Sequence, residues 1–349
     1  MDELLKKLLE APGVSGYESG IASSGGVAAI IEAELKKTCK SVEYDSMGNL
    51  ISKKGSGKIK IMFAAHMDEI GLVVKFISKE GFIYFAKLGG IDDRVLVGQR
   101  VVIKTKRGDV SGIIGLKPPH LMKEEEKKQI VKYEDMFIDI GCSTREEAAS
   151  KVAIADSVIF EPNAGVLNGS LCYGKAVDNR VGCYVLIKVM ERLKVDAEVY
   201  GVATVQEEVG LKGAKISAFR LNPDYAFALD TTISGDTPSI KETESAMKLG
   251  AGVGITVIEA SGRGTIVNER MKDLLINTAA ENNIKHQVGV MEGGMTDAAV
   301  IHLNREGVLT GVLSIPTRYI HSPTGVFSMD DINSAIDLAV KSAEKLAAK

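Results

Sequence analysis

The sequence predicts an α/β fold in two parts: a three-layer α/β/α domain with a mixed central sheet, and an inserted all-β domain that resembles a barrel. Three observations predict this fold. The 349 residues are long for one core and short for three, so two domains are expected. Apolar strands alternate with helices in residues 1–65 and in the second half. Between these regions lies a run of short β-rich segments.

The α/β part is predicted from the spacing of its apolar residues. The N-terminal stretch MDELLKKLLEAPG is expected to be a short amphipathic helix and not a signal peptide, because acids lie near its start. Further helices are predicted at residues 22–38, 179–193 and 267–282, from Thr296, and from about Asp330. Strands are predicted at residues 58–66, 198–206, 224–230, 249–258, 286–291 and 308–315. Strands that are apolar throughout indicate a sheet covered on both faces.

Residues 70–165 differ, because Gly and charged turns separate short strands and little is helical. The strands are predicted at residues 71–77, 81–89, 99–108, 109–117 and 156–162. A charged stretch at 122–128 is expected to be solvated, and a short helix is expected at 144–151. The predicted domains are therefore a discontinuous α/β domain at 1–69 and 166–349, and an inserted β domain at 70–165.

The composition is that of a soluble globular chain, 45% hydrophobic and 26% charged. A net charge of −3 with scattered positive charges argues against a nucleic-acid partner, which requires a basic face. No apolar run reaches the ~18 residues that a membrane span needs. The four cysteines lack C-x-x-C spacing, so reduced thiols in a cytoplasmic protein are expected.

Acids and histidines occur where the predicted strands of the α/β part end. Sites in open α/β sheets lie at the carboxyl ends of strands. The residues at such positions are His66 and Asp68 after one strand, Asp178 at a helix start, Glu207 and Glu208 after VATVQ, Asp230 after YAFAL, and His321 in a loop. We expect these residues to meet at one edge of one sheet.

Each of these residues alone has an ordinary structural explanation. A strand-end histidine is most often structural, and Asp178 is a candidate helix N-cap. Asp230 could cap a turn, and Glu208 could be a surface acid. Together, however, clustered carboxylates resist burial unless a cation lies among them. Histidines and carboxylates suit Zn or other borderline divalent metals, and they can hold two ions if one carboxylate bridges.

The adjacent acids Glu207 and Glu208 indicate two different carboxylate roles in hydrolysis. Adjacent strand residues point to opposite faces, but at a strand terminus both can reach one site. One acid can bind a metal while the other acts as general base on a metal-bound water.

Three other functions fit parts of this pattern. A metal-dependent deacylase or carboxypeptidase would use a similar scaffold. A glycosidase would use Glu207 and Glu208 as its carboxylate pair, but adjacent residues seldom give the ~5 Å or larger separation which that reaction needs. A non-catalytic assembly protein with a structural metal site has no need for a free Glu207 beside a ligand.

Seven segments resemble, in order, the signature segments of the tetrahedral (TET) aminopeptidases, a family that includes deblocking and glutamyl aminopeptidases and some members with an endoglucanase label. The segments are APGVSGYE (11–18), AAHMDEIG (64–71), KAVDNRVG (175–182), VQEEVGLKGA (205–214), LD (229–230), GGMTDA (293–298) and YIHSPTGV (319–326). The resemblance covers essentially the whole chain, with the β insertion at the expected place.

The resemblance implies a role for each strand-end residue. The implied metal ligands are His66, Asp178 and Asp230 for one ion, and Asp178, Glu208 and His321 for a second, with Asp178 bridging. Glu207 would be the general base, and Asp68 would orient His66. The two ions would be Zn or Co, or alternatively Mn. A strained peptide bond is implied between Asp178 and Asn179.

The resemblance also implies an aminopeptidase that acts on short peptides within a homo-oligomer, a tetrahedral dodecamer, without nucleic-acid or membrane partners. His120 could contact an active site, although an interface or structural role is favoured. Asp297 is interpreted as a helix cap. Residues 231–250 are expected to shape the pocket for the first side chain, and the opposite charges of Asp236 and Lys248 leave its preference open.

Overall fold

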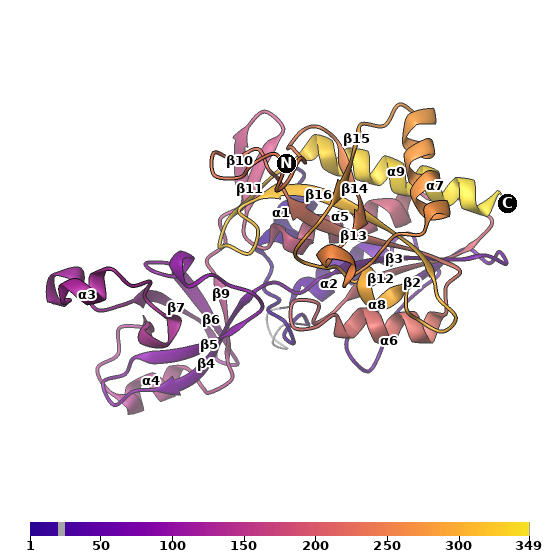
Figure 1. Cartoon of the computed structure of the whole chain (residues 1–349). Helices are drawn as coiled ribbons and strands as arrows, with labels where there is room; N and C mark the ends of the chain where they lie inside the picture. The colour runs from indigo at the N-terminus through magenta and orange to yellow at the C-terminus, as the bar shows by residue number, and fades with distance from the viewer. Residues whose placement is uncertain (20–24, 349) are drawn as a thin grey trace.

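A computed structural model describes residues 1–19 and 25–348 and has the predicted two-part architecture. In Figure 1 a six-stranded barrel lies to one side of a larger part, in which helices cover a central sheet. The sheet is mixed and has eleven strands among the described residues. The predicted three-layer α/β/α fold with an inserted β barrel is therefore confirmed.

The central sheet has the strand order β1-β2-β12-β3-β13-β16-β17-β11-β10, and β14 pairs with β16 and β15. The strands are β1 (Ser41–Tyr44), β2 (Leu50–Lys54), β3 (Lys60–His66), β10 (Gly165–Asn168), β11 (Leu171–Gly174), β12 (Glu198–Thr204), β13 (Tyr225–Ile233), β14 (Val253–Ile258), β15 (His286–Val290), β16 (Leu309–Arg318) and β17 (Gly325–Ser328). The central run β12-β3-β13-β16 is parallel, and antiparallel strands flank it. Its carboxyl ends therefore lie at one edge.

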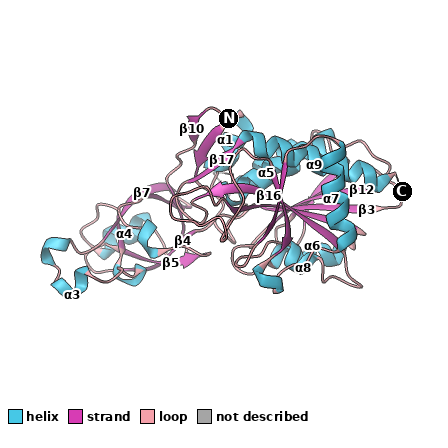
Figure 2. Cartoon of the chain, turned by 45° about the horizontal axis from the view of Figure 1, so that its top comes forward, coloured by secondary structure: helices cyan, strands magenta, loops and turns pink. Residues whose placement is uncertain are grey.

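Two layers of helices cover the sheet (Figure 2). One face carries α1 (Glu3–Glu10), α2 (Val27–Leu35), α5 (Val177–Arg192), α7 (Glu269–Glu281) and α9 (Met329–Ala347), and the other carries α6 (Lys212–Leu221) and α8 (Ala298–Ile301). Successive residues of β12 enter the two cores, since Ala203 packs with the first layer and Val202 with the second. Packing on both faces thus fixes the central strands.

The predicted elements differ from the observed ones mainly at their ends. The helix predicted at 22–38 is α2, which starts at Val27, and residues 22–24 lie outside the described residues. The strand predicted at 224–230 continues to Ile233 as β13. The helix predicted from Thr296 is only the single turn α8. The short strands β1, β2, β10, β11 and β17 have no counterpart in the prediction, because four or five residues of mixed polarity carry little pattern.

The inserted strands close into a barrel with the order β4-β5-β8-β7-β6-β9. They are β4 (Gly71–Ile77), β5 (Ile83–Leu88), β6 (Arg100–Thr105), β7 (Gly108–Gly115), β8 (Phe137–Asp139) and β9 (Ser157–Phe160), with the helices α3 (Glu124–Lys127) and α4 (Arg145–Lys151). Leu72, Ile103, Ile138 and Val158 are fully buried in a core separate from that of the sheet. The helix predicted at 144–151 is α4, and Thr144 caps it.

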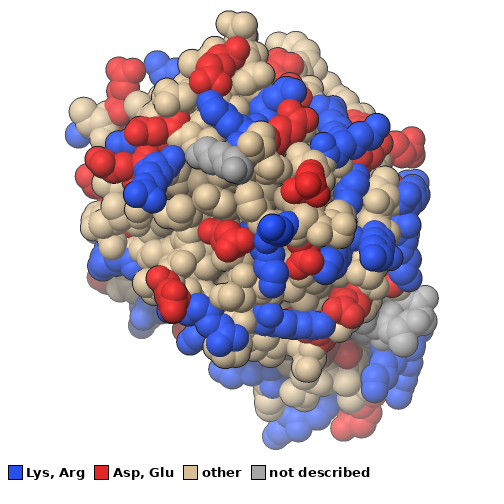
Figure 3. Space-filling view, turned by 90° about the vertical axis from the view of Figure 1, so that its right-hand side faces the viewer, with Lys and Arg blue, Asp and Glu red and all other residues tan. Residues whose placement is uncertain are grey.

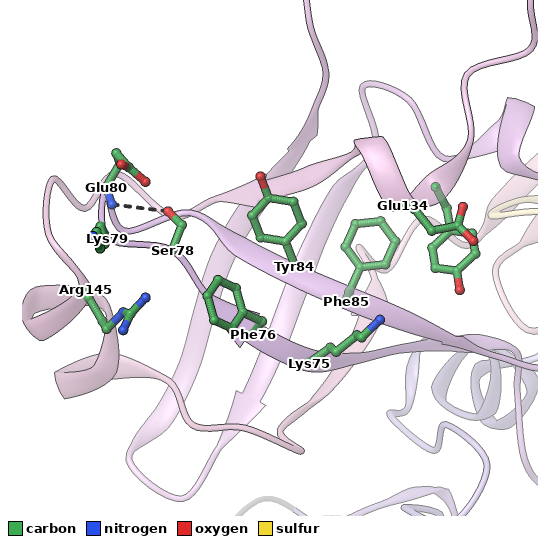
Figure 4. Close-up of a pocket in the computed structure, with 10 residues that line it drawn as sticks. Lys75, Phe76, Ser78, Lys79, Glu80, Tyr84, Phe85, Glu134 and Arg145 are labelled. Atoms are coloured by element: carbon green, nitrogen blue, oxygen red, sulfur yellow. Dashed lines mark hydrogen bonds between the residues drawn. The ribbon is translucent and has the colours of Figure 1, made fainter.

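A pocket of about 510 Å³ lies on the outside of the barrel (Figure 4). Phe76 is 48% exposed there, with the Arg145 guanidinium carbon 5.3 Å and the Tyr84 ring centroid 6.1 Å from its ring centroid. None of the strand-end acids or histidines of the central sheet lines this pocket. It is thus a surface feature of the insert, separate from the site that the sequence predicts.

Charged side chains are intermixed on the face shown in Figure 3, where Lys and Arg lie beside Asp and Glu. That face has no continuous basic area of the kind that nucleic-acid binding requires. Across residues 1–19 and 25–348, no helix combines the length and apolar character needed to cross a membrane.

Candidate active site

The candidate site lies where parallel strands end at one edge of the central sheet. His66 is the last residue of β3, and Asp230 lies near the end of β13. Thr204 ends β12 directly opposite His66, and Glu207 and Glu208 follow in the next turn. Because neighbouring parallel strands end at the same edge, these residues come together as the sequence predicts.

Two groups of side chains at this edge could each hold a metal ion, and they share Asp178. The groups are His66, Asp178 and Asp230, and Asp178, Glu208 and His321, with the ligand atoms of each within 4.8 Å of one another. Asp178 Oδ1 is 3.1 Å from His66 Nε2, and Asp178 Oδ2 is 3.3 Å from His321 Nε2. His66 Nε2 is 3.6 Å from Asp230 Oδ1, and His321 Nε2 is 3.6 Å from Glu208 Oε2. One carboxylate oxygen of Asp178 thus lies near His66 and the other near His321, which is the arrangement that a bridging ligand needs.

The backbone at the start of α5 directs Asp178 into the site. Ala176 has a left-handed φ of 52°, and Asp178 has non-helical angles. The peptide bond between Asp178 and Asn179 is cis, at the position that the family resemblance marks. Asn179 Nδ2 donates to the Leu229 carbonyl at 2.8 Å, and its Oδ1 accepts from the Gly182 N–H at 3.0 Å. These bonds hold Asp178 toward the site, and it is not the helix cap.

Asp68 is fully buried beneath the site and contacts three of its residues. Its Oδ1 accepts from the Glu207 N–H at 3.0 Å, and its Oδ2 accepts from the Glu208 N–H at 3.2 Å and the Ser15 hydroxyl at 2.6 Å. His66 Nδ1 lies 3.4 Å from Oδ1 and 3.2 Å from the Asp68 carbonyl. Burial opposes ionisation, but these partners, led by His66, hold the pKa of Asp68 below its usual value.

Glu207 points into the site without belonging to either ligand group. Its Oε2 is 3.9 Å from His66 Nε2, and its side chain is 10% exposed. Desolvation raises the pKa of Glu207 well above its usual value. The charge of His66 lowers this pKa, whereas the charges of Asp230 and Asp297 raise it further. A carboxyl group that lies beside both candidate ligand groups, but outside them, is placed to exchange a proton with a molecule bound there.

The chemistry of both groups fits divalent cations. Burial raises the pKa of Glu208 to about 8, helped by the charge of Asp178, and burial raises that of Asp230 to about 6. Glu208 Oε1 is buried and has no hydrogen-bond partner among the described residues. A cation in each group would offset the repulsion and satisfy this oxygen. Two histidines with three carboxylates form a donor set that Zn and similar ions accept.

Asp297 lies at the start of α8 as predicted but has an unexpected side-chain partner, and Glu18 was not among the predicted site residues. Asp297 makes no side-chain cap; it is buried, and its Oδ2 accepts from the Thr204 hydroxyl at 2.5 Å. Asp297 thus occupies the N-cap position of α8, but its side chain does not cap the helix, because the end of β12 lies against the start of α8. Glu18 Oε1 accepts from the N–H groups of Gly16 and Gln206 at 2.9 and 3.0 Å, so it anchors the turn after β12. Its position in the APGVSGYE segment is the signal that could have revealed it.

The site opens into a cleft of about 710 Å³, a size typical of small-molecule sites. Its walls combine the ligand groups and Glu207 with residues 231–233, Met291 and residues 293–296. His120 does not line this cleft. It lies instead in a short turn of the insert, where it is exposed.

Comparison with known proteins identifies the family of this chain. The family model described as M42 glutamyl aminopeptidase matches residues 48–338. The chain belongs to the M42 peptidase family. An Acetivibrio thermocellus relative with an aminopeptidase name is 43% identical to the M42 chain over 98% of each. Lysyl aminopeptidase of Pyrococcus furiosus is 34% identical to this chain, over 99% of this chain and 97% of its own length. Glutamyl aminopeptidase of Lactococcus lactis is 33% identical, over 95% of this chain and 92% of its own length.

Solved structures of the same kind superpose on the M42 chain. A TET aminopeptidase from a marine-sediment Thaumarchaeota archaeon has a TM-score of 0.94 and 41% identity, covering 99% of this chain and 96% of its own. Pyrococcus horikoshii TET1 peptidase has a TM-score of 0.86 and 36% identity, covering 99% of this chain and 98% of its own. That peptidase is described as assembling into a tetrahedron or a large octahedral shell. The TET resemblance is confirmed, and the chain is a peptide hydrolase of the aminopeptidase class.

Proposed function

We propose that this M42 chain is a dinuclear metallo-aminopeptidase that removes N-terminal residues from short peptides, with Glu207 as general base. The observation that carries the proposal is the pair of ligand groups that share Asp178, with Glu207 outside both and 3.9 Å from His66. The ions proposed are Zn or Co, with Mn as a further candidate.

The proposed roles follow from the positions of the side chains. His66, Asp178 and Asp230 would hold one ion, and Asp178, Glu208 and His321 the other. Bound ions of this kind polarise a carbonyl and lower the pKa of water. A carboxylate oxygen of Glu207 takes the proton of the attacking water and returns it to the leaving amine nitrogen.

A metal titration with paired substrates tests this function. We expect metal-stripped protein to leave aminoacyl-p-nitroanilides intact, and about two equivalents of Zn, Co or Mn per chain to restore hydrolysis. N-acetylated substrates should stay intact because the site would require a free amine. Cleavage of the acetylated series would favour a deacylase. Full activity with a single ion would contradict the dinuclear centre, and tight metal binding without hydrolysis would favour a structural site.

Asp68→Asn is expected to lower metal affinity by about 10- to 100-fold, the usual effect of losing a residue that orients a metal ligand. Asparagine has one acceptor oxygen where Asp68 uses two, so the N–H of Glu207 or Glu208 would lose its acceptor. Competition with a chelating dye measures this effect. Asp273→Asn, the same change at an exposed position of α7, should leave affinity unchanged. Equal affinities in the two variants would contradict the role proposed for Asp68.

We also propose that the chain forms a tetrahedral dodecamer in the cytoplasm, with residues 70–165 as the assembly domain and residues 1–69 and 166–349 as the catalytic domain. The related TET1 peptidase forms a dodecamer, which supports the assembly state. Exposed apolar side chains on the insert, including Phe76, Ile113 and Ile130, are available for contacts between subunits. Analytical ultracentrifugation should give twelve times the mass of the chain, and a monomeric mass at assay concentration would contradict the proposal.

A further inference from the structure

The walls of the active-site cleft indicate which N-terminal residue the site accepts. We propose that the cleft selects peptides whose first residue has a large aliphatic side chain, of the leucine or methionine class, and that Met291 contacts this side chain. The inference rests on the aminopeptidase function proposed above and specifies its substrate. It departs from the lysyl and glutamyl names of two relatives.

The first residue of a peptide is the one whose side chain must enter this cleft, because its amine and its scissile carbonyl both meet the ligand groups. Strand β13 extends the cleft wall from those groups, since Asp230 and Thr232 are two residues apart and point to the same face. Thr232 thus lies roughly 7 Å beyond Asp230 along the strand. Its Oγ1 is 3.3 Å from Met291 Sδ. The Met291 thioether therefore lies at the depth that a long side chain would reach.

Met291 combines a fixed backbone with an adaptable side chain. Its N–H donates to the Ile258 carbonyl at 2.8 Å, and its carbonyl accepts from the Ser261 N–H at 3.2 Å. The unbranched, polarizable thioether can adjust to different apolar partners. Ile233 and Met295, 44% and 47% exposed, continue the apolar wall toward the cleft opening. These side chains offer apolar contact rather than hydrogen bonds.

The cleft provides a charged first side chain with no ion-pair partner beyond the ligand groups and Glu207. Among the described residues that line it, none is Lys or Arg, and its acids are the ligand groups and Glu207. Asp236 and Lys248, whose opposite charges left the substrate preference open in the sequence, pair with other residues. Asp236 accepts from Arg318 Nε and Nη2 at 2.9 and 2.6 Å, and Lys248 pairs with Glu242 at 3.3 Å.

Neither Asp236 nor Lys248 lines the cleft. A glutamate or lysine side chain entering the cleft would therefore lose hydration without gaining an ion pair outside the ligand groups and Glu207. An aliphatic side chain would instead transfer apolar surface from water onto Met291 and its neighbours. Both effects favour the aliphatic residue.

Hydrolysis of Leu-, Met-, Ala-, Glu- and Lys-p-nitroanilide by the metal-loaded protein tests this inference. We expect kcat/KM for Leu and Met to exceed that for Ala about tenfold, and that for Glu and Lys on the order of 100-fold. Preference for Glu or Lys would overturn the inference while leaving the aminopeptidase function intact. Failure to hydrolyse any of the five substrates would overturn the proposed function itself.

Substitutions locate the selectivity at Met291. Met291→Lys should reduce the preference for Leu over Glu by about 100-fold, because it adds a cation where the first side chain lies. Val288→Lys is the matched control, since Val288 is 48% exposed on β15 and does not line the cleft. Met291→Leu should retain the preference.

Calorimetric binding of the free amino acids leucine and glutamate, which are products of the proposed reaction, to the same metal-loaded variants gives a readout independent of turnover. The affinity ratio should change in Met291→Lys and stay constant in Val288→Lys. Equal ratios in these two variants would overturn the role of Met291.

Discussion

Glu207→Gln is expected to lower kcat for a free-amine substrate by about 10²- to 10⁴-fold, the range associated with loss of a general base. Glutamine keeps the size of the side chain but cannot take the proton of the attacking water. Glu207 belongs to neither ligand group, so both ions should remain bound. Metal content by mass spectrometry and steady-state kinetics on the same sample measure the two effects together.

Two matched substitutions show what is specific to Glu207. Glu208→Gln makes the same change one residue later in a ligand group, so it should remove one ion per chain as well as activity. Glu292→Gln makes it at an exposed residue that does not line the cleft, and it should change neither quantity. Loss of an ion in Glu207→Gln would show that Glu207 is a ligand, and near-normal kcat would remove it from the mechanism.

The strand-end residues were accessible from sequence because their signal is local. His66 follows the apolar run of β3, and Asp230 follows that of β13, so the strand pattern alone placed both at one edge. The pairing of Asp178 with His321 is different, since these residues are far apart in the chain and come together only through the fold. The family resemblance supplied that pairing, and the geometry agrees with it.

The errors and omissions share a physical cause, which is long-range packing. Asp297 precedes a helix and follows Gly-rich residues, so local rules favour a cap. Its partner is Thr204 at the end of another strand, 93 residues earlier, and no local pattern reports that contact. Likewise Glu18 accepts from Gln206, 188 residues later. Such buried polar pairs follow from the arrangement of strands and not from the propensity of either segment.

A buried ion cluster behind the ligands was also absent from the sequence prediction. Glu69, Lys175 and Arg180 are each at most 1% exposed. Lys175 Nζ is 2.8 and 2.6 Å from the two Glu69 carboxylate oxygens, and Arg180 Nη2 is 3.2 Å from one of them. Both cations also donate to the Ala11 carbonyl, at 3.1 and 3.0 Å. The cluster thus joins the end of α1 to the segments that carry Asp68 and Asp178.

Glu69→Gln is expected to lower the free energy of unfolding by about 3–5 kcal/mol, because it leaves two buried cations without their shared anion. Urea unfolding of metal-free protein at one protein concentration measures this change. Glu191→Gln is the control: its partner Lys188 is 3.0 Å away, but Glu191 is 51% exposed. That change should cost less than about 1 kcal/mol. Equal costs for the two substitutions would show that the buried cluster is not a stabilising unit.

The charge balance of the cluster predicts an order of stability among its variants. That order differs from the one expected if only the number of lost hydrogen bonds mattered. Lys175→Met leaves Glu69 paired with Arg180, so it should destabilise less than Glu69→Gln although it removes more hydrogen bonds. Combining the two substitutions removes the anion together with one cation, and the double variant should be more stable than Glu69→Gln alone. If unpaired charge dominates, adding Lys175→Met to Glu69→Gln therefore restores stability. If lost hydrogen bonds dominate, adding Lys175→Met restores nothing, because it also removes the Lys175 bond to the Ala11 carbonyl, and the double variant is no more stable than either single variant.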